Sequence, residues 1–468
     1  MTRYIKTGVA LSLALLGAAC DSFIQGPGLT ENPNSPTQAT MTQQLVAVQA
    51  NMFTRLEGQL ARNSAIYTQQ VIGTFNQQLQ YGTQYNFPET EVSPHMSGFY
   101  TGGGLVGLRK VQADANAADD KLIEGIAKVW EGYAMGTATS IWGDLPYSEA
   151  LQQDILTPKL DAQQDIYTAV QKLFDDGLTL LAAAPTTGNC DPADLIYCAT
   201  PGTRALQVSR WIAATNTLKA RFYLHLVERQ GNTAYQAALA AATNGIAEAP
   251  TSVTQAMHGQ APGDFRSFHG NTLDDGNIWA QFLTSRQDIA AGNVLVALLK
   301  ARSDPRLTAY FDANTSGTVI GVDQNARVVG TGAASVINVS VRRSLTFRQP
   351  LVTWAENQLI LAEAKFKLGD LPGALANTNN VRRAVGLTDL ATITFDDVMA
   401  EKYIAQFQNI DVWSDYKRTC YPTLTPFGTR TEVIGRLLYG SAERNANPNI
   451  PLASNQPARN WDDPNAYP

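Results

Sequence analysis

Apolar residues recur at helical spacing along most of the chain, and many of these segments are rich in alanine. One apolar face and one polar face per segment indicate amphipathic helices that pack on a shared core. The pattern therefore predicts a mainly α fold. The predicted helices cover residues 40–62, 105–118, 121–141, 161–183, 209–229, 235–247, 293–300, 353–368, 372–384 and 395–416.

Three of the predicted helices end near a glycine, at Gly143, Gly231 and Gly369. Glycine readily takes the positive φ that ends a helix. Alanine-rich helices follow the second and third glycines, and small side chains let paired helices approach closely. The pattern is typical of tetratricopeptide-like helix pairs, although the repeat period is not kept. The pairs are therefore expected to be separated by large insertions.

Three long stretches between the helices lack helical periodicity, at residues 73–104, 248–292 and 303–349. Long loops in a compact domain tend to be functional. Alternating apolar and polar residues at 319–341 also predict one or two short hairpins. No linker interrupts residues 37–468, which we expect to form a single domain.

The start of the chain resembles a bacterial lipoprotein signal over residues 1–19. Arg3 and Lys6 precede an apolar run at residues 9–16, which is too short to span a bilayer. Small residues then lead into Cys20, which we expect to carry the lipid anchor. The alternative is an ordinary cleavage site with a coincidental cysteine. Residues 20–36 are rich in Gly, Pro, Asn and Ser and are interpreted as a tether.

Net charge limits the classes of binding partner, and two of the cysteines are candidates for a disulfide. Without the signal segment, 33 basic and 41 acidic residues give a net charge near −8. With no cluster of Lys or Arg, nucleic-acid binding is disfavoured. Cys190 and Cys198 flank a loop and would form a disulfide in an exported protein if their positions allow it, which the sequence leaves open. Cys420 is expected to be a buried small side chain.

Several motifs, in order along the chain, resemble those of the SusD/RagB family of outer-membrane nutrient-binding lipoproteins. They are Gly143-Asp144-Leu145-Pro146-Tyr147, the helix from Trp211 to Leu224 with Ala220-Arg221-Phe222, Asp304-Pro305-Arg306-Leu307, Ala362-Glu363-Ala364 with Val381-Arg382-Arg383, and residues 408–439. Before residue 130 the family has a Trp-containing segment, whereas this chain has Met96-Ser97-Gly98-Phe99-Tyr100.

The resemblance implies tetratricopeptide-like helix pairs packed with a loop-rich lobe. It also implies a lipid-anchored protein on the outer membrane, facing the cell exterior. Such proteins form the lid of a partner TonB-dependent (SusC-like) barrel and deliver oligosaccharides or peptides to it. They are not enzymes.

Candidate ligand contacts come from the first two insertions, where aromatic rings alternate with polar residues. A flat ring covers the apolar face of a sugar, and polar side chains bind its hydroxyls. The candidates are Tyr81, Tyr85, Phe87, Phe265, Arg266, Phe268, His269, Asn271 and Trp279. The alternative, that these rings fix their loops to the scaffold, stays open for each residue. Trp142, Trp211, Trp354 and Trp413 are expected in the core, with Arg221 and Glu363 in buried polar pairs.

Catalytic motifs are missing from the sequence. No HExxH, CxxC, Walker A or GxSxG element occurs, so we expect no catalytic residue, metal or cofactor. A calcium ion held by loop carboxylates around Asp274 and Asp275 stays an open alternative. Five Asp-Asp pairs, at 119–120, 175–176, 274–275, 396–397 and 462–463, are interpreted as solvated faces and helix caps. Two alternatives remain: a surface glycoside hydrolase, and a free-standing solute-binding lipoprotein with an α/β fold. These motifs do not distinguish a glycan ligand from a peptide ligand.

Overall fold

The computed structural model describes residues 39–323, 325 and 332–465. The predicted signal segment, Cys20 and the tether lie outside the described residues. The chain divides into two units, Met1–Gln44 and Leu45–Pro468. In the first unit, Thr40 and Gln43 bond each other's backbone N–H, which caps the start of a helix. Everything below concerns the second unit. Within the described part, no helix combines the length and apolarity needed to cross a membrane.

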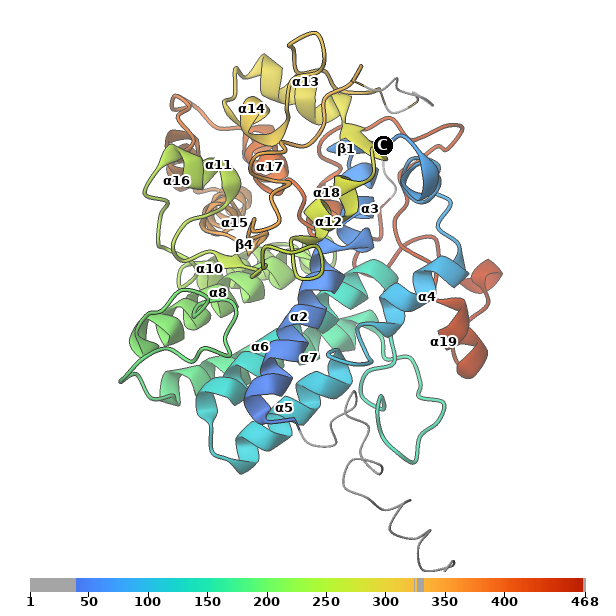
Figure 1. Ribbon diagram of the computed structural model, residues 1–468, viewed down its shortest axis with the longest axis vertical. Helices are drawn as coiled ribbons and strands as arrows, with labels where there is room; N and C mark the ends of the chain where they lie inside the picture. Colours follow the sequence, from blue (N-terminus) through green and yellow to red (C-terminus); the bar gives the residue numbers. More distant parts are fainter. Residues whose placement is uncertain (1–38, 324, 326–331, 466–468) are drawn as a thin grey trace, which may run out of the picture. The chain divides into compact units, whose positions relative to one another are not determined.

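The second unit is mainly helical, which confirms the predicted fold class (Figure 1). The longer helices are α2 (Met41–Glu57), α3 (Gln59–Tyr67), α4 (Glu89–Ser97), α5 (Leu105–Ala117), α6 (Lys121–Trp142), α7 (Gln163–Ala183), α8 (Arg204–Leu224), α10 (Asn232–Ala242), α13 (Asn293–Ala301), α15 (Trp354–Lys367), α16 (Leu371–Ala384), α17 (Phe395–Ala405) and α18 (Val412–Thr419). The short ones are α9 (Val227–Gln230), α11 (Val253–His258), α12 (Ile278–Thr284), α14 (Arg306–Tyr310), α19 (Ser441–Ala446), the π-helix η1 (Gln78–Thr83) and the 3₁₀-helix η2 (Ala453–Asn455).

Neighbouring helices pack in a continuous series, as expected for tetratricopeptide-like pairs. The series runs α5, α6, α7, α8, α10, α15 and α16, with α17 also packed on α15 and α16. Gly369 separates α15 from α16 and has a φ of 90°, so the predicted positive φ at this turn is confirmed. The tight turn at Gly369 lets α16 fold back and pack against α15. Stacked pairs of this kind bury a shared core.

Three predicted helices are each divided in the structure. The helix expected at residues 209–229 separates into α8 and α9, with His225 and Leu226 between them. The helix expected at residues 40–62 breaks at Gly58, where an added Cβ would lie 2.3 Å from the Thr54 carbonyl oxygen. The helix expected at residues 395–416 breaks between α17 and α18. In that break, Gln408 has a φ of 67°, and Asn409 donates to the carbonyl oxygens of Pro350 and Leu351. Tertiary contacts therefore override helical periodicity in this segment.

The strands are very short and pair across long sequence distances. β1 (Val71–Gly73) pairs antiparallel with β3 (Ile289–Ala291), and β2 (Phe265–Arg266) pairs antiparallel with β4 (Pro350–Val352). These ladders join the first insertion to the second, and the second to the start of α15. They are not local hairpins.

The third insertion, where hairpins were expected at residues 319–341, forms isolated bridges. Val322 bridges Gly292, and Ile337 bridges Phe311, with no strand among the described residues of this segment. The described residues contain no parallel sheet either. The fold therefore contradicts the α/β solute-binding alternative.

An aromatic cluster forms the centre of the core. Phe265 on β2 is fully buried, and its ring centroid lies 5.0 Å from Trp130 on α6 and 5.2 Å from Trp211 on α8, both edge-on. Edge-to-face contacts at these distances are favourable. The four tryptophans predicted to be in the core, Trp142, Trp211, Trp354 and Trp413, are all buried. Phe265 thus joins the second insertion to the helix pairs.

Arg221 on α8 makes polar contacts with several other elements in the core. Its guanidinium donates two hydrogen bonds to the Glu356 carboxylate on α15, of 2.6 and 2.7 Å. It also donates to the Leu351 carbonyl oxygen on β4 at 2.7 Å and to the Tyr133 hydroxyl on α6 at 3.2 Å. Asp411 lies 3.6 Å away and also contacts His225 at 3.0 Å. The predicted buried pairing of Arg221 is therefore confirmed.

Glu363 on α15 forms a second buried ion-pair network. Its carboxylate accepts hydrogen bonds from Arg418 on α18 and from Lys402 on α17, and Lys402 also reaches Asp415 at 3.0 Å. Burial alone would raise the pKa of Glu363, but Arg418 and Lys402 together lower it. The carboxylate therefore stays ionised, and the predicted buried pairing of Glu363 is also confirmed.

Replacing Arg221 with methionine should lower the free energy of unfolding by about 3–5 kcal/mol, because Glu356 would be left charged and unpaired in the core. Urea unfolding of the purified chain measures the change. The control is Lys172→Met, which removes an exposed ion pair with Asp176 and should cost at most about 0.5 kcal/mol. Similar losses in the two variants would show that the Arg221 network does not stabilise the fold.

Asp264 is a further buried carboxylate, and no ion pair with it occurs among the described residues. It accepts hydrogen bonds of 2.7 Å from the backbone N–H groups of Trp354 and Ala261. Burial raises the pKa of Asp264 to about 7, despite these bonds and the nearby Arg266. The folded protein therefore binds this proton more tightly than the unfolded chain does.

The raised pKa of Asp264 predicts that the wild type loses stability as the pH rises from about 4 to about 7. Relative to Asp264→Asn, which cannot titrate, the loss should approach about 1.4 kcal/mol per pH unit. Urea unfolding of both proteins between pH 5 and pH 8 measures the difference. Parallel stability curves over that range would mean that Asp264 does not titrate as described.

Candidate functional site

The three aromatic candidates in the first insertion are buried and contact other rings. Tyr81 stacks on Phe87 with centroids 4.9 Å apart, and Tyr85 contacts Phe427 at the same distance. These contacts fix the loop to its surroundings. Tyr85 and Phe87 also line a cavity of about 360 Å³, here called the Tyr85 cavity, together with Arg430, Glu432 and Gln456.

Three candidates in the second insertion lie inside the protein. Phe265 and Trp279 are fully buried, and His269 is 7% exposed. His269 contacts the Ser267 hydroxyl at 2.8 Å and the Glu57 carboxylate at 2.9 Å. In this structure the three side chains have structural contacts, and their predicted role in ligand binding stays a prediction.

The other three candidates in the second insertion are accessible but dispersed. Phe268 is 41% exposed, and Asn271 lies on the exposed loop that follows it. Arg266 is half-buried and lines a separate small pocket. The nine candidates therefore do not converge on one site.

The structure instead brings the ends of the first two insertions together in an open surface hollow. β1 pairs with β3, and just beyond this ladder Thr74 donates its N–H to the Asp288 carbonyl oxygen at 2.8 Å. The hollow beside this contact has a volume of about 490 Å³. It is lined by Asn76, Gln77, Ser285, Arg286, Gln287 and Asp288, and is called the surface hollow below.

The polar groups of the surface hollow are held by one another. Asp288 is 3% exposed, and its carboxylate accepts a hydrogen bond of 3.1 Å from the Asn76 amide. Its second oxygen lies 3.5 Å from the Arg286 guanidinium and accepts no hydrogen bond from the described residues. Asn76 has a φ of 49°, a conformation that Asn tolerates better than most residues. Amide, guanidinium and carboxylate groups thus meet at one place.

Aromatic rings accompany these polar groups. Phe75, next to Asn76, is 40% exposed. Two guanidinium groups contact the Phe282 ring, with Arg62 at 4.1 Å and Arg286 at 5.2 Å from its centroid. Burial, together with the charge of Arg286, lowers the pKa of Arg62 to about 9. A cation over the face of an aromatic ring is attracted by that ring, and the contact restrains the orientation of both side chains.

The surface hollow has the chemistry of a site for a neutral polar ligand. It offers hydrogen-bond donors and acceptors in an open hollow, and the exposed Phe75 precedes Asn76 in the chain. The sequence pointed to the first insertion through its alternating aromatic and polar residues, but it did not single out Asn76, Arg286 or Asp288. The pairing of two three-residue strands brings these residues together, and such short strands leave little periodic signal.

The Glu57, Ser267 and His269 side chains contain the residue types of a nucleophilic triad, but their geometry excludes a relay. Both Ser267 and Glu57 contact the same ring nitrogen of His269, Nε2. A relay needs the nucleophilic hydroxyl on one nitrogen of the histidine ring and the orienting carboxylate on the other. All three side chains are also buried. We interpret this group as a structural contact between α2 and the second insertion.

Most Asp-Asp pairs have the solvated or capping roles that were expected. Asp120 caps α6, and Asp397 forms a capping box with Thr394 on α17. The expectation is wrong for the last pair, because Asp462 and Asp463 are buried. Asp462 accepts a hydrogen bond of 2.8 Å from the Tyr167 hydroxyl. Among the described residues, no group of three or more potential ligands could hold a metal ion.

The cysteines outside the anchor region are also placed by the structure. Cys190 and Cys198 form a disulfide with their Cα atoms 5.7 Å apart, which is the pairing that the sequence left open. Cys420 is free and half-buried. The disulfide closes the loop that leads into α8.

Comparisons with known proteins identify the family of this fold. The model of the SusD-like family, described as "Starch-binding associating with outer membrane", matches residues 33–385. The solved structure of a chitin-binding protein has a TM-score of 0.72 at 22% identity, and the match covers 91% of this chain and 100% of that one. None of the curated proteins compared with the chain matches it.

Two further solved structures show the same fold. A chitin-binding SusD homologue from Flavobacterium johnsoniae has a TM-score of 0.70 at 18% identity, covering 91% of this chain and 98% of that one. A SusD/RagB family protein from Bacteroides thetaiotaomicron has a TM-score of 0.70 at 18% identity, covering 92% and 100%. The resemblance read from the sequence motifs is thereby confirmed.

Proposed function

We propose, since this chain belongs to the SusD-like family, that it is a binding protein that captures an oligosaccharide in the surface hollow. The observation that carries the proposal is the meeting of two insertions at Asn76, Arg286 and Asp288, with the exposed Phe75 next to Asn76 in the chain. A ring supplies an apolar platform for a sugar face, and the polar groups bind hydroxyls at its edge.

The class of ligand is suggested by the family and by structural neighbours. The family description names starch, and two neighbours of the same fold are named as chitin-binding. Oligomers of N-acetylglucosamine and of glucose are therefore the first ligands to test. Peptide stays the second candidate, because an open hollow lined by amide groups also suits an extended backbone.

Capture would be followed by hand-over to a partner. We propose that the protein is anchored through a lipid on Cys20 to the outer membrane, facing the cell exterior, and acts as the lid of a TonB-dependent barrel of the SusC-like type. The support is the order of the family motifs and the lipobox-like segment before Cys20. Binding without turnover fits this role, because a hand-over protein must release its ligand unchanged.

Removing the exposed ring or the guanidinium of the surface hollow should weaken oligosaccharide binding. We expect Phe75→Ala and Arg286→Ala each to raise the Kd about tenfold, which corresponds to about 1.4 kcal/mol, because each group contacts the ligand directly. Isothermal titration with N-acetylglucosamine and glucose oligomers measures the Kd. Chromatography of the recovered sugar should show that its length is unchanged.

The matched control for Arg286 is Arg430→Ala, another exposed arginine, which lines the Tyr85 cavity instead. It should leave the Kd unchanged. A tenfold loss in Arg430→Ala with none in Arg286→Ala would move the site to the Tyr85 cavity. Shortened sugar products that are lost with a single carboxylate substitution would establish a glycoside hydrolase instead.

A further inference from the structure

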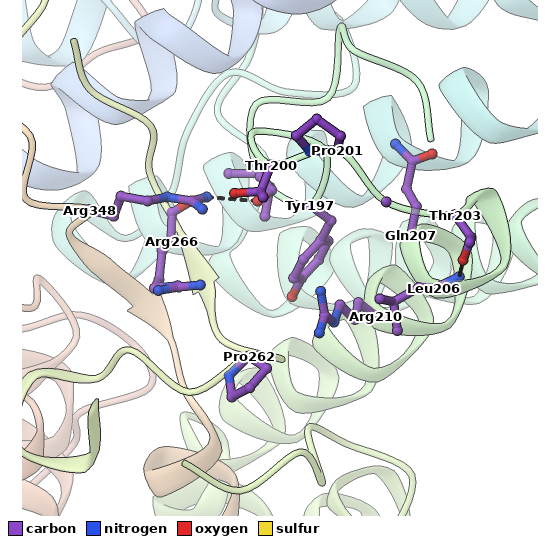
Figure 2. A pocket seen from close by; sticks show the side chains of 12 residues that line it. Tyr197, Thr200, Pro201, Thr203, Leu206, Gln207, Arg210, Pro262, Arg266 and Arg348 are labelled. Carbon is purple, nitrogen blue, oxygen red and sulfur yellow. Dashed lines mark hydrogen bonds between the residues drawn. The ribbon is translucent and has the colours of Figure 1, made fainter. Parts of the chain in front are cut away.

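A small pocket beside the first turn of α8 gathers three arginine side chains, away from the surface hollow. Figure 2 shows Arg266 and Arg348 on one side of Tyr197 and Arg210 on the other. Ile196, in the loop closed by the Cys190–Cys198 disulfide, and Thr200, just after that loop, form another wall. The volume is about 130 Å³, and no Asp or Glu is among the residues that line it.

Arg348 is held in place by backbone groups alone. Its Nε donates to the Ser267 carbonyl oxygen at 2.8 Å, and its Nη2 donates to those of Ile196 at 2.7 Å and Arg266 at 3.0 Å. It makes no ion pair with any carboxylate of the described residues. The side chain is thus fixed in direction while its charge remains without a direct counterion.

Arg266, which lines the same pocket, has an unsatisfied hydrogen-bond donor. Its Nη1 donates to the Gln260 side chain at 2.9 Å, but its Nε is buried and has no hydrogen-bond partner among the described residues. A buried donor without an acceptor costs about 1–3 kcal/mol. Burial lowers the pKa of Arg266, and it lowers that of Arg348 to about 10, with Arg266 adding to the effect. Both pKa values are lowered because nearby carboxylates do not fully offset the cost of burying the two charged guanidinium groups.

The nearest carboxylates are bound elsewhere. Glu248 accepts two hydrogen bonds from Arg210, of 3.0 and 2.7 Å, which leaves Nη1 of Arg210 outside that pair. Asp194 accepts from the indole N–H of Trp211 at 2.7 Å and from the Gln207 amide at 2.8 Å. Asp264 is bound to backbone N–H groups and has its pKa raised by burial to about 7. The pocket therefore keeps an excess of positive charge near neutral pH.

We infer that this pocket binds a single tetrahedral oxyanion, sulfate or phosphate, either free or as an ester on a sugar. Guanidinium forks match pairs of oxygens on such a group. The volume lies well below the roughly 300–1,000 Å³ of pockets for drug-sized ligands, so one small group fits and a sugar chain does not. The first turn of α8, next to Thr203, adds the partial positive charge of a helix N-terminus.

Titration calorimetry of sodium sulfate and sodium phosphate into the full chain at low ionic strength tests the inference. Wild type should bind sulfate, and Arg266→Met should raise the Kd at least tenfold. Arg383→Met, which alters an exposed arginine paired with Asp389, should leave the Kd unchanged. Absence of sulfate binding to wild type, or equal Kd values in wild type and Arg266→Met, would overturn the proposal.

A second measurement guards against a folding defect, because Arg348 also joins several backbone segments. At matched ionic strength, sulfate should raise the Tm of wild type above its value in chloride, by linkage of binding to folding. The increase should vanish in Arg348→Met and persist in Arg383→Met. An equal increase in all three proteins would show an unspecific salt effect and contradict the site.

The source of the oxyanion is separated by comparing inorganic sulfate with N-acetylglucosamine 6-sulfate. Tighter binding of the sulfated sugar assigns the pocket to an ester group, and equal binding assigns it to the free ion. The test is independent of the surface hollow, because Phe75→Ala should retain sulfate binding and Arg266→Met should retain binding of neutral oligosaccharide. Failure of one site is therefore visible without failure of the other.

Discussion

The buried guanidinium of Arg221 is the contact on which the arrangement of the other elements depends. It joins α8 to α15 through Glu356, to β4 through Leu351 and to α6 through Tyr133. A buried charge is tolerated only when its partners are all in place. The helix pairs and β4 are therefore constrained together. Because β4 pairs with β2, the constraint extends to the second insertion, and to Phe265 in the aromatic core.

The loops that carry the proposed sites are fixed by this scaffold at both ends. β1 and β3 bring the first and second insertions together at the surface hollow, while Arg348 joins β2 to the disulfide-closed loop beside α8. Binding residues on loops held by a rigid scaffold are a common arrangement in proteins. Here one insertion contributes to two places of different chemistry. One suits a neutral polar chain, and the other suits a single anionic group.

The helices and the buried pairs could be predicted because their signals are local. Apolar spacing located most of the longer helices to within a few residues, but it missed α4 in the first insertion. The glycine at 369 marked a real turn. Arg221 and Glu363 were predicted in buried pairs because charged residues on apolar helix faces need partners. Two of the three breaks within predicted helices were missed because they depend on the close backbone approach at Gly58 and on the contacts of Asn409.

The site was predicted less well, since an aromatic residue in a loop has two possible roles. Phe265 and Trp279 have the composition of a binding loop but lie in the core, whereas Phe268 on the same insertion is exposed. Sequence alone does not separate them, because β2 is only two residues long and gives no alternating pattern. Asn76 and Asp288 meet through strand pairing between distant segments, which single-sequence periodicity does not report.

The most direct test of the account is the identity of the proteins that accompany this chain in its own membrane. The intact protein would be extracted with mild detergent from the membranes of the cells that make it. After purification, the proteins that accompany it would be identified by mass spectrometry. Capture and hand-over predict a TonB-dependent barrel in equal amount. Recovery of the chain alone, under conditions that preserve known barrel complexes, would contradict the account.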